Sequence, residues 1–391
     1  MEHPEEHYYK VNRFLLSVTG LCPYQSKWRA RLIRAVLTVT MLITIVLLIN
    51  SIFITSDITV DYMVDWIPAF LIVLIALTNL YTRIIHVDKF RELFERMSRD
   101  WALQKTHDEA KIMHEHAETA RLFTLCCLSA AYIFVGIYII WMFSSEVLDI
   151  ISPMNESRPQ RQPINIQFFI DDERYSYHVR TQISVVLLVT TTIYISCTGL
   201  FQTHAQHVCG MCELLGYRAE RLFCVVKNEV ACDLNQKSQI SYGNIAIFVR
   251  QHCNIIKFVD IIETCNTIQF LIDLIGHIIM MSLTLIQMLT FSNFERAFRS
   301  ISVSIVGLCY MFMSCYMGQR IRDSSSSICE KIFNCAWNNT VVPKQKALLI
   351  IMMRRYRPLI LTGCKFYVMS LQNFGMILQT TISYCMFMRQ F

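Results

Sequence analysis

Charge is scarce in this chain. Of its 391 residues, only 17% are Asp, Glu, Lys or Arg, whereas 54% are hydrophobic, and the mean hydropathy is +0.38. Soluble domains carry a larger charged share, about a quarter of their residues. The composition therefore excludes an ordinary soluble protein and indicates a polytopic membrane protein. The net charge of +6 does not indicate nucleic-acid binding, because most Lys and Arg residues are concentrated in segments that are predicted on one side of the membrane.

Motifs of catalysis and cofactor binding are missing as well. The sequence has no glycine-rich phosphate loop, no nucleophile elbow and no catalytic-triad pattern, so we expect neither an enzyme nor a cofactor. Cys209 and Cys212 have partial metal-ligand spacing with His204 and His207. No second pair follows at a zinc-finger distance, and on a helix these side chains would scatter around the axis. We interpret them as ordinary buried groups and expect no metal.

Seven stretches with little or no charge are long enough to cross a bilayer as helices. The second contains Pro68 near its start, and the fifth contains Asp273 and His277. The first 34 residues are polar and charged rather than a cleavable signal peptide, so the first apolar stretch is expected to target the chain. The predicted spans are Ala35 to Thr55, Trp66 to Thr82, Leu122 to Ser145, Thr181 to Thr203, Cys265 to Thr290, Ser300 to Gln319 and Phe366 to Met388.

The Lys and Arg residues predict which side of the membrane each connection occupies. Residues 1–34, 83–121, 204–264 and 320–365 hold 29 of the 36, whereas the connections on the other side hold 7. The amino terminus is therefore predicted in the cytoplasm and the carboxyl terminus outside, the inverse of a G-protein-coupled receptor. The Asn155 glycosylation sequon then lies outside and the Asn338 sequon inside. All 16 cysteines fall in spans or on the cytoplasmic side, which implies free thiols.

These assignments predict an all-α protein of four parts. Residues 1–34 form a cytoplasmic segment, with a helix at residues 11–21 expected at the membrane interface. Residues 35–203 hold four spans and a large outer loop, 146–180. Residues 204–365 hold the fifth and sixth spans with long helical cytoplasmic segments, and residues 366–391 hold the last span. The charged segment 83–121 is also expected to be helical.

Two polar features inside the spans allow more than one interpretation. Asp273 and His277 are four residues apart and share a helix face, as a proton-coupled transporter pair or a structural hydrogen-bonded pair would. In the last span, Gln372, Gln379 and Ser383 step by seven and four residues and share one stripe with Gln390 just beyond it. Such a stripe faces either neighbouring helices or a water-filled pore, because polar groups are costly in hydrocarbon.

Aromatic and apolar residues gather at the predicted outer ends of the spans. Trp66 and Phe70 begin the second, and Phe134, Tyr138 and Trp141 share one face of the third. They could line an apolar small-molecule pocket, or they could form the interfacial aromatic belt of a membrane protein. The fourth span adds a pair four residues apart, Val186 and Thr190.

Several motifs together resemble the insect odorant receptor family, closest in pattern to receptors of ants, bees and wasps. Each motif is diffuse, but the set is specific and extends over the whole chain. The matching residues are Asn12, Arg13, Leu15, Gly20 and Pro23 near the start, then Phe333 to Trp337, Leu348 to Met353 and Pro358, and finally Phe366, Ser370, Phe374, Ser383 and Tyr384.

The resemblance implies a heterotetramer with the odorant receptor co-receptor in the plasma membrane of the olfactory neuron dendrite. It implies a cytoplasmic anchor domain and a weakly selective cation pore lined by the last span, with Phe387 at the gate and Gln390 at the pore glutamine. A volatile or hydrophobic odorant would bind among the second, third, fourth and sixth spans, where Ile137, Ser304 and Leu308 complete the predicted site. The alternatives are a metabotropic seven-helix chemoreceptor, which the charge distribution opposes, a gustatory-type receptor, and a transporter based on Asp273 and His277.

Overall fold

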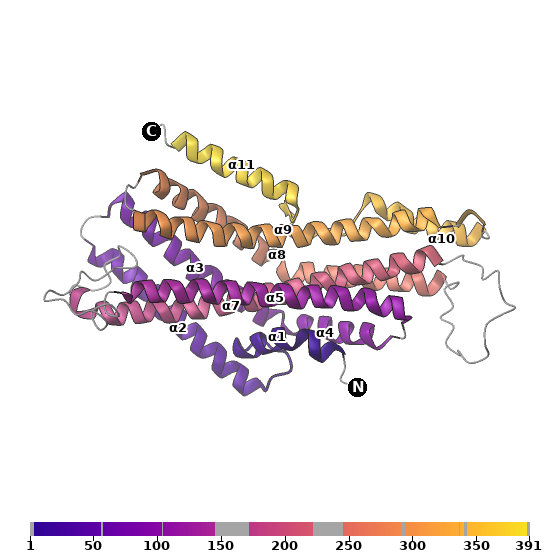
Figure 1. The fold of residues 1–391 in the computed structure, drawn as a ribbon, viewed down its shortest axis with the longest axis horizontal. Coiled ribbons are helices and arrows are strands. Elements are labelled where there is room, and N and C mark those ends of the chain that lie inside the picture. The colour runs from indigo at the N-terminus through magenta and orange to yellow at the C-terminus, as the bar shows by residue number, and fades with distance from the viewer. Residues whose placement is uncertain are drawn as a thin grey trace.

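The helices of this chain lie side by side as an elongated bundle (Figure 1). The computed structural model describes residues 4–55, 58–103, 105–144, 172–221, 245–290, 294–335, 337–339 and 342–388. The helices are α1 (Pro4–Val18), α2 (Lys27–Ile54), α3 (Val60–Ile85), α4 (Val87–Ala102), α5 (His107–Met142), α7 (Asp172–Arg221), α8 (Ile245–Thr290), α9 (Phe294–Asn334), α10 (Val342–Met352) and α11 (Leu371–Met388). The described residues also contain two 3-10 turns, Trp337–Asn339 and Met353–Tyr356, and two short strands, β1 (Thr362–Gly363) and β2 (Tyr367–Val368).

Six helices in the described residues are long and apolar enough to cross a membrane, and they coincide with the first six predicted spans. Only helices satisfy their backbone hydrogen bonds internally in hydrocarbon, which is why apolar length alone located them. Several continue well past the bilayer: the 50 residues of α7 extend about 75 Å at 1.5 Å per residue. The charged segments around residues 83–121 and 204–221 are helical, as predicted.

The structure corrects two element boundaries. α7 begins at Asp172, so the end of the predicted outer loop 146–180 is helical. There Arg180 is buried, with its guanidinium 5.4 Å from the Phe143 ring centroid. The predicted all-helical last span instead starts with a strand, and its helix begins at Leu371 rather than Phe366. Asn155 lies outside the described residues, and Asn338 is exposed in the turn Trp337–Asn339.

The amino-terminal helix α1 begins earlier than the predicted helix at residues 11–21, and it packs on α5 and α7. Its position at the membrane interface stays a prediction. Leu15 and Leu16 are buried, and the Asn12 amide bonds the Thr203 hydroxyl of α7. Gly20 turns the chain toward α2 with a φ of 69°, in the left-handed region that glycine tolerates. A Cβ there would approach the Ala30 carbonyl oxygen to 2.9 Å, so the turn also needs the small residue.

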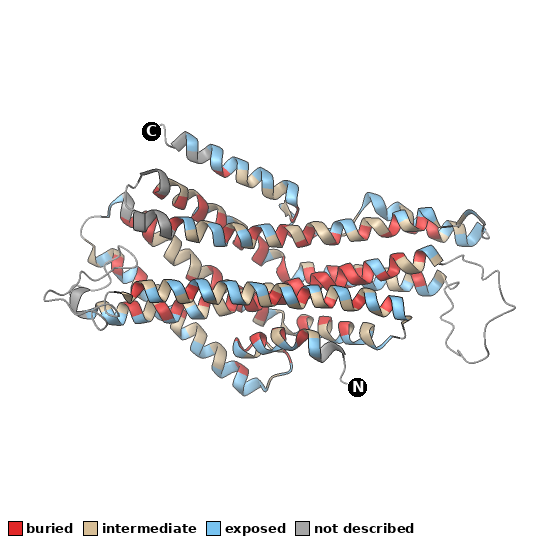
Figure 2. Cartoon of the chain, in the orientation of Figure 1, coloured by how far each residue is buried: buried red, intermediate tan, exposed pale blue. Residues whose placement is uncertain are grey.

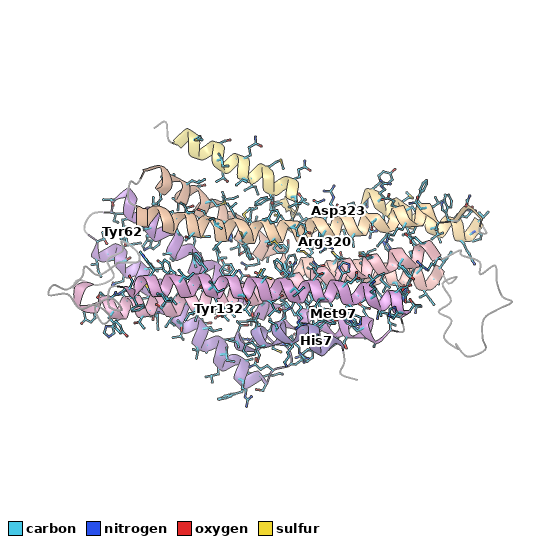
Figure 3. All side chains as sticks on the ribbon, viewed as in Figure 1. His7, Tyr62, Met97, Tyr132, Arg320 and Asp323 are labelled. Atoms are coloured by element: carbon cyan, nitrogen blue, oxygen red, sulfur yellow. The ribbon has the colours of Figure 1, made fainter. Side chains whose placement is uncertain are left out.

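The core is centred on α7. Every residue from 199 to 212 is buried, so this part of the helix is enclosed on all sides, by neighbours that include α1, α5, α8 and α9. Figure 2 shows the same concentration of burial along the inner helices. Hydrogen bonds to neighbouring helices hold α7 in place. One joins the hydroxyls of Tyr132 and Thr192, which are 2.6 Å apart; Tyr132 is labelled in Figure 3. At the other end, Arg218 donates two hydrogen bonds to the buried Glu109 carboxylate, at 2.7 and 3.0 Å.

Candidate pore helix and ligand-facing residues

The last helix, α11, starts from a short hairpin. Strands β1 and β2 pair antiparallel, and Cys364 and Lys365 at the tip have positive φ values of 51° and 64°. Such values are unfavourable for residues with a Cβ, so surrounding contacts must hold the tip. The Ser370 hydroxyl then accepts a hydrogen bond from the backbone N–H of Asn373 at 3.2 Å and caps the start of α11.

Helices α8 and α9 clamp this hairpin. The Thr267 hydroxyl of α8 accepts a bond from the Cys364 amide at 2.7 Å and donates one to the Thr362 carbonyl at 2.9 Å. On α9, Gly318 lies so close to the segment after β2 that an added Cβ would come 2.4 Å from the Met369 carbonyl oxygen. The base of α11 is therefore positioned by long-range contacts, which local sequence patterns do not report.

The polar stripe lies on the exposed side of α11. Gln372, Gln379 and Ser383 are exposed in the single chain, whereas Thr381 is buried on the opposite side. Phe374 packs edge to face on Phe312 of α9, with ring centroids 5.7 Å apart. Figure 2 shows little burial along α11, which lies at the edge of the bundle. The Phe387 side chain and Gln390 fall outside the described residues.

Asp273 is the centre of a buried polar network in the middle of the bundle. Its carboxylate accepts hydrogen bonds from Gln269 at 2.7 Å, Asn79 at 3.3 Å and the Tyr310 hydroxyl at 2.7 Å. These donors come from α8, α3 and α9, so one carboxylate joins three helices. A carboxylate removed from water needs such donors, because an unpaired charge there would be very costly.

His277 does not contact the Asp273 carboxylate. Its Nδ1 bonds the Asp273 backbone carbonyl at 2.6 Å, and its ring stacks on Tyr310 with centroids 5.1 Å apart. Gly307 of α9 allows this packing, because a Cβ there would lie 3.1 Å from the imidazole ring. Of the two sequence interpretations, this geometry favours a structural role for the pair.

A small cleft separates this network from the base of α11. Asp273, Tyr310 and Phe270 line one part, and Tyr367 and Met369 of the hairpin segment line another. Its volume is about 10 Å³, enough for roughly one water molecule. The buried carboxylate and the start of α11 are therefore neighbours across the fold.

Of the predicted ligand residues, those on α3 and α7 lie inside the bundle. Trp66 and Phe70 are half-buried and stacked, with ring centroids 4.9 Å apart, and the Trp66 indole donates to the Leu48 carbonyl at 2.7 Å. Val186 and Thr190 are buried, and the Thr190 hydroxyl bonds the Val186 carbonyl of its own helix.

The predicted residues on α5 and α9 divide between inside and surface. Tyr138 and Trp141 are half-buried with ring centroids 5.6 Å apart, and Ser304 and Leu308 are also half-buried. In contrast, Phe134 is 37% exposed and Ile137 60% exposed on α5. Helical spacing showed that these residues share a side of α5, but the packing decides which part of that side meets other helices.

A second polar cluster near Trp66 escaped the sequence analysis. Gln287 of α8 donates a 2.7 Å bond to the Asp65 carboxylate of α3 and accepts one from the Ser300 hydroxyl of α9. Nearby, the hydroxyls of Thr284 and Ser304 are 2.6 Å apart. The available signal was an acidic residue next to the second predicted span, together with polar residues at the matching ends of the fifth and sixth.

The candidate metal residues are dispersed among other partners. His207 bonds the Asp100 carboxylate at 3.1 Å, while His204 packs among Phe90, Phe94 and Phe258. Cys209 and Cys212 are buried. In the described part of the chain, no three His, Cys, Asp or Glu residues form a group that could hold a metal ion.

The long apolar helices define a multi-pass membrane protein. A family model described as "7tm Odorant receptor" matches residues 59–382, most of the chain. The protein therefore belongs to the insect odorant receptor family, which confirms the resemblance seen in the sequence. Members of this family are receptors or channels rather than enzymes.

Individual relatives give the same assignment. The chain is 23% identical to odorant receptor 10a of Drosophila melanogaster over 205 residues, which are 52% of this chain and 50% of that receptor. It is 27% identical to the odorant receptor coreceptor of Anopheles gambiae over 93 residues, 22% of this chain and 20% of the coreceptor. The chain thus spans half the length of the Drosophila receptor that it matches, and less of the coreceptor.

The fold is similar over nearly the whole chain to a solved structure, the insect olfactory receptor OR5 from Machilis hrabei in complex with eugenol. The TM-score is 0.79 with 13% sequence identity, and the similarity covers 98% of each chain. A second structure of OR5 gives a TM-score of 0.75 with 12% identity, over 98% of this chain and 97% of that one. At this identity the comparison establishes the fold alone.

Proposed function

We propose that this chain is the odorant-tuning subunit of an odorant-gated, non-selective cation channel that it forms with the odorant receptor coreceptor. The observation that carries the proposal is the stripe of Gln372, Gln379 and Ser383, which the fold leaves exposed at the edge of the bundle. Polar groups in a bilayer need polar partners or water. Facing a central pore, between subunits, supplies that water.

The relatives support the ligand and the partner. The Machilis receptor with this fold was solved with eugenol, a small organic molecule. Similarity to the coreceptor fits a shared architecture for the two kinds of subunit. The assembly we propose is a heterotetramer in the plasma membrane of the olfactory neuron dendrite, with α11 as the seventh span. The parts of α7 and α9 that extend beyond the bilayer would form the anchor domain, together with other such helical parts and α10.

One experiment tests the channel directly. Membrane patches are excised from cells that express this chain with the coreceptor, so that soluble signalling components are removed. Odorant-evoked cation current that persists in such patches supports a ligand-gated channel. Current that requires added nucleotide and G protein would instead favour the metabotropic chemoreceptor. The transporter alternative is not proposed, because the His277 imidazole is hydrogen-bonded to the Asp273 backbone carbonyl rather than to its carboxylate.

We propose that the odorant binds beside the inward residues of the predicted set, namely Trp66, Phe70, Tyr138, Trp141, Val186, Thr190, Ser304 and Leu308. Phe134 and Ile137 are left out of the proposed site because they are exposed on α5. The cluster of Asp65, Gln287 and Ser300 adds polar groups close to Trp66. A mainly apolar site with few polar groups suits a hydrophobic odorant.

Removal of aromatic surface should weaken odorant binding. Tyr138→Ala and Trp141→Ala are expected to lower odorant potency by roughly tenfold or more, since loss of a large apolar side chain costs a few kcal/mol. Ile140→Ala is the matched control, because Ile140 lies on the same helix but is exposed. Dose–response curves in cells expressing the coreceptor measure the effect. Equal potency in all three variants would exclude Tyr138 and Trp141 from the site.

The proposed inverted topology makes a separate prediction. Asn155 should be glycosylated and Asn338 should not, because only Asn155 lies on the predicted outer side. Asn155→Gln is expected to abolish a glycosidase-sensitive mobility shift, and Asn338→Gln to leave it unchanged. A shift that survives Asn155→Gln would contradict this orientation.

A further inference from the structure

After three glutamates, Glu2, Glu5 and Glu6, the charge near the start of the chain is of one sign up to residue 34. Residues 7–34 contain six Lys or Arg residues and no Asp or Glu. One of the six, Arg34, donates a 2.7 Å bond to the Gly20 carbonyl and holds the turn between α1 and α2. The other five are exposed and form what we name the basic patch: Lys10, Arg13, Lys27, Arg29 and Arg31.

The cations of the basic patch are not neutralised within the described part of the chain. There, no ion pair joins any of the five to an acidic side chain. The Arg13 guanidinium lies over the Tyr24 ring, 5.9 Å from its centroid. Glu95 and Arg91 of α4 also face Tyr24: partial burial and the Glu95 charge raise the pKa of its phenol, while Arg13 and Arg91 act in the opposite direction.

Large exposed aromatic side chains accompany these cations. Trp28 is 72% exposed and Phe14 is 65% exposed, and Tyr24 is exposed as well. Trp and Tyr are enriched where a membrane meets water, because one part of the ring system is apolar and another is polar. Lys and Arg side chains favour the same region, where an apolar stem carries a charged head.

The length and position of α2 place this patch at the lipid surface. Its 28 residues extend about 42 Å, close to the 40–45 Å of a bilayer with its headgroups. Only 11% of its most apolar stretch is buried, so α2 is a peripheral helix. In Figure 1, α2 and α11 lie on opposite edges of the bundle, so a patch at the start of α2 faces away from the proposed pore helix.

We propose that the basic patch binds the headgroups of anionic phospholipids in the cytoplasmic leaflet. Arg guanidinium groups pair with phosphate oxygens through two parallel hydrogen bonds, and Lys adds a compact charge. The first turn of α2 adds backbone N–H groups, because Ser26 makes no side-chain capping bond to them. The leaflet assignment rests on the cytoplasmic amino terminus proposed above, whereas the binding chemistry does not.

The test is a titration of the purified full chain in detergent micelles with fluorescent phosphatidylserine or phosphatidylcholine. Micelles have no sides, so a wrong topology would not mask binding. We expect phosphatidylserine to bind at least about tenfold more tightly, since each basic residue near an anionic surface contributes about fivefold. Replacement of Lys27, Arg29 and Arg31 by Gln should remove most of this preference.

Two control variants separate binding from misfolding. The Arg354→Gln, Arg355→Gln, Arg357→Gln variant removes three exposed cations elsewhere and should keep the preference. The double variant Arg29→Lys, Arg31→Lys retains the charge and should keep most of the preference for phosphatidylserine. Unchanged lipid selectivity after loss of Lys27, Arg29 and Arg31 would overturn the proposal. Equal affinity for phosphatidylserine and phosphatidylcholine in the unsubstituted chain would do so too.

Discussion

Cysteine introduced at Gln379 or Ser383 should react with a water-soluble thiol reagent and reduce the odorant-evoked current, whereas cysteine at Phe374 should not. Gln379 and Ser383 are exposed on one side of α11, while Phe374 packs on Phe312. A thiol reacts as the thiolate, which forms readily only where water reaches it, so rates should differ by at least about tenfold. Current recorded before and after brief reagent exposure measures the difference.

The controls for this experiment follow from the structure. Native Cys385 is replaced in the background because it is close to Ser383 in the sequence. The chain without an added cysteine must also be treated, since Cys126, Cys253 and Cys309 are exposed thiols. Thr381→Cys, at a buried position of α11, is a second control. Reactivity without a helical period, or mainly at positions 374 and 381, would mean that α11 is a packing element and that the pore lies elsewhere.

Replacement of Asp273 by Leu should cause a large loss of stability. Three donors, from the buried Asn79 and Gln269 and the half-buried Tyr310, would lose their shared acceptor. The Asn79 amide keeps its bond to the Ile75 carbonyl, but the other two donors would be left unpaired. Each such donor costs about 1–3 kcal/mol, so the total is expected to be at least about 2 kcal/mol. The apparent melting temperature of the purified full chain in detergent should fall clearly. Tyr310→Phe removes one donor but leaves the carboxylate with two others. The melting temperature of this variant should therefore fall less.

Asp323→Asn provides the matched control for Asp273. Asp323 bonds Gln319 on the exposed side of α9, and Figure 3 labels it there. Exposed substitutions usually change stability by no more than about 0.5 kcal/mol, so this variant should melt close to the unsubstituted chain. If Asp273→Leu melted at the same temperature as Asp323→Asn, the network would not hold α3, α8 and α9 together.

The ligand-facing residues show how far periodicity extends. The pattern correctly put Phe134, Tyr138 and Trp141 on one side of the third span, yet Phe134 is more exposed than its two partners. A helical period gives the angle between two residues of one helix, but not the angle of that helix to its neighbours. For the same reason, the sequence could not place Asp65 beside Gln287, which is 222 residues away.

The sequence by itself determined the class of protein, six of its spans and its family. Apolar length is sufficient for a span, because a chain in hydrocarbon must satisfy its backbone hydrogen bonds within its own helix. It also placed Gln372, Gln379 and Ser383 on one side of the last helix, because that relation depends only on helix geometry. Only the tertiary structure decided that α11 begins at Leu371, where Thr267 of a distant helix holds the preceding hairpin. It alone decided the partners of Asp273, since hydrogen bonds between helices depend on how the whole chain packs.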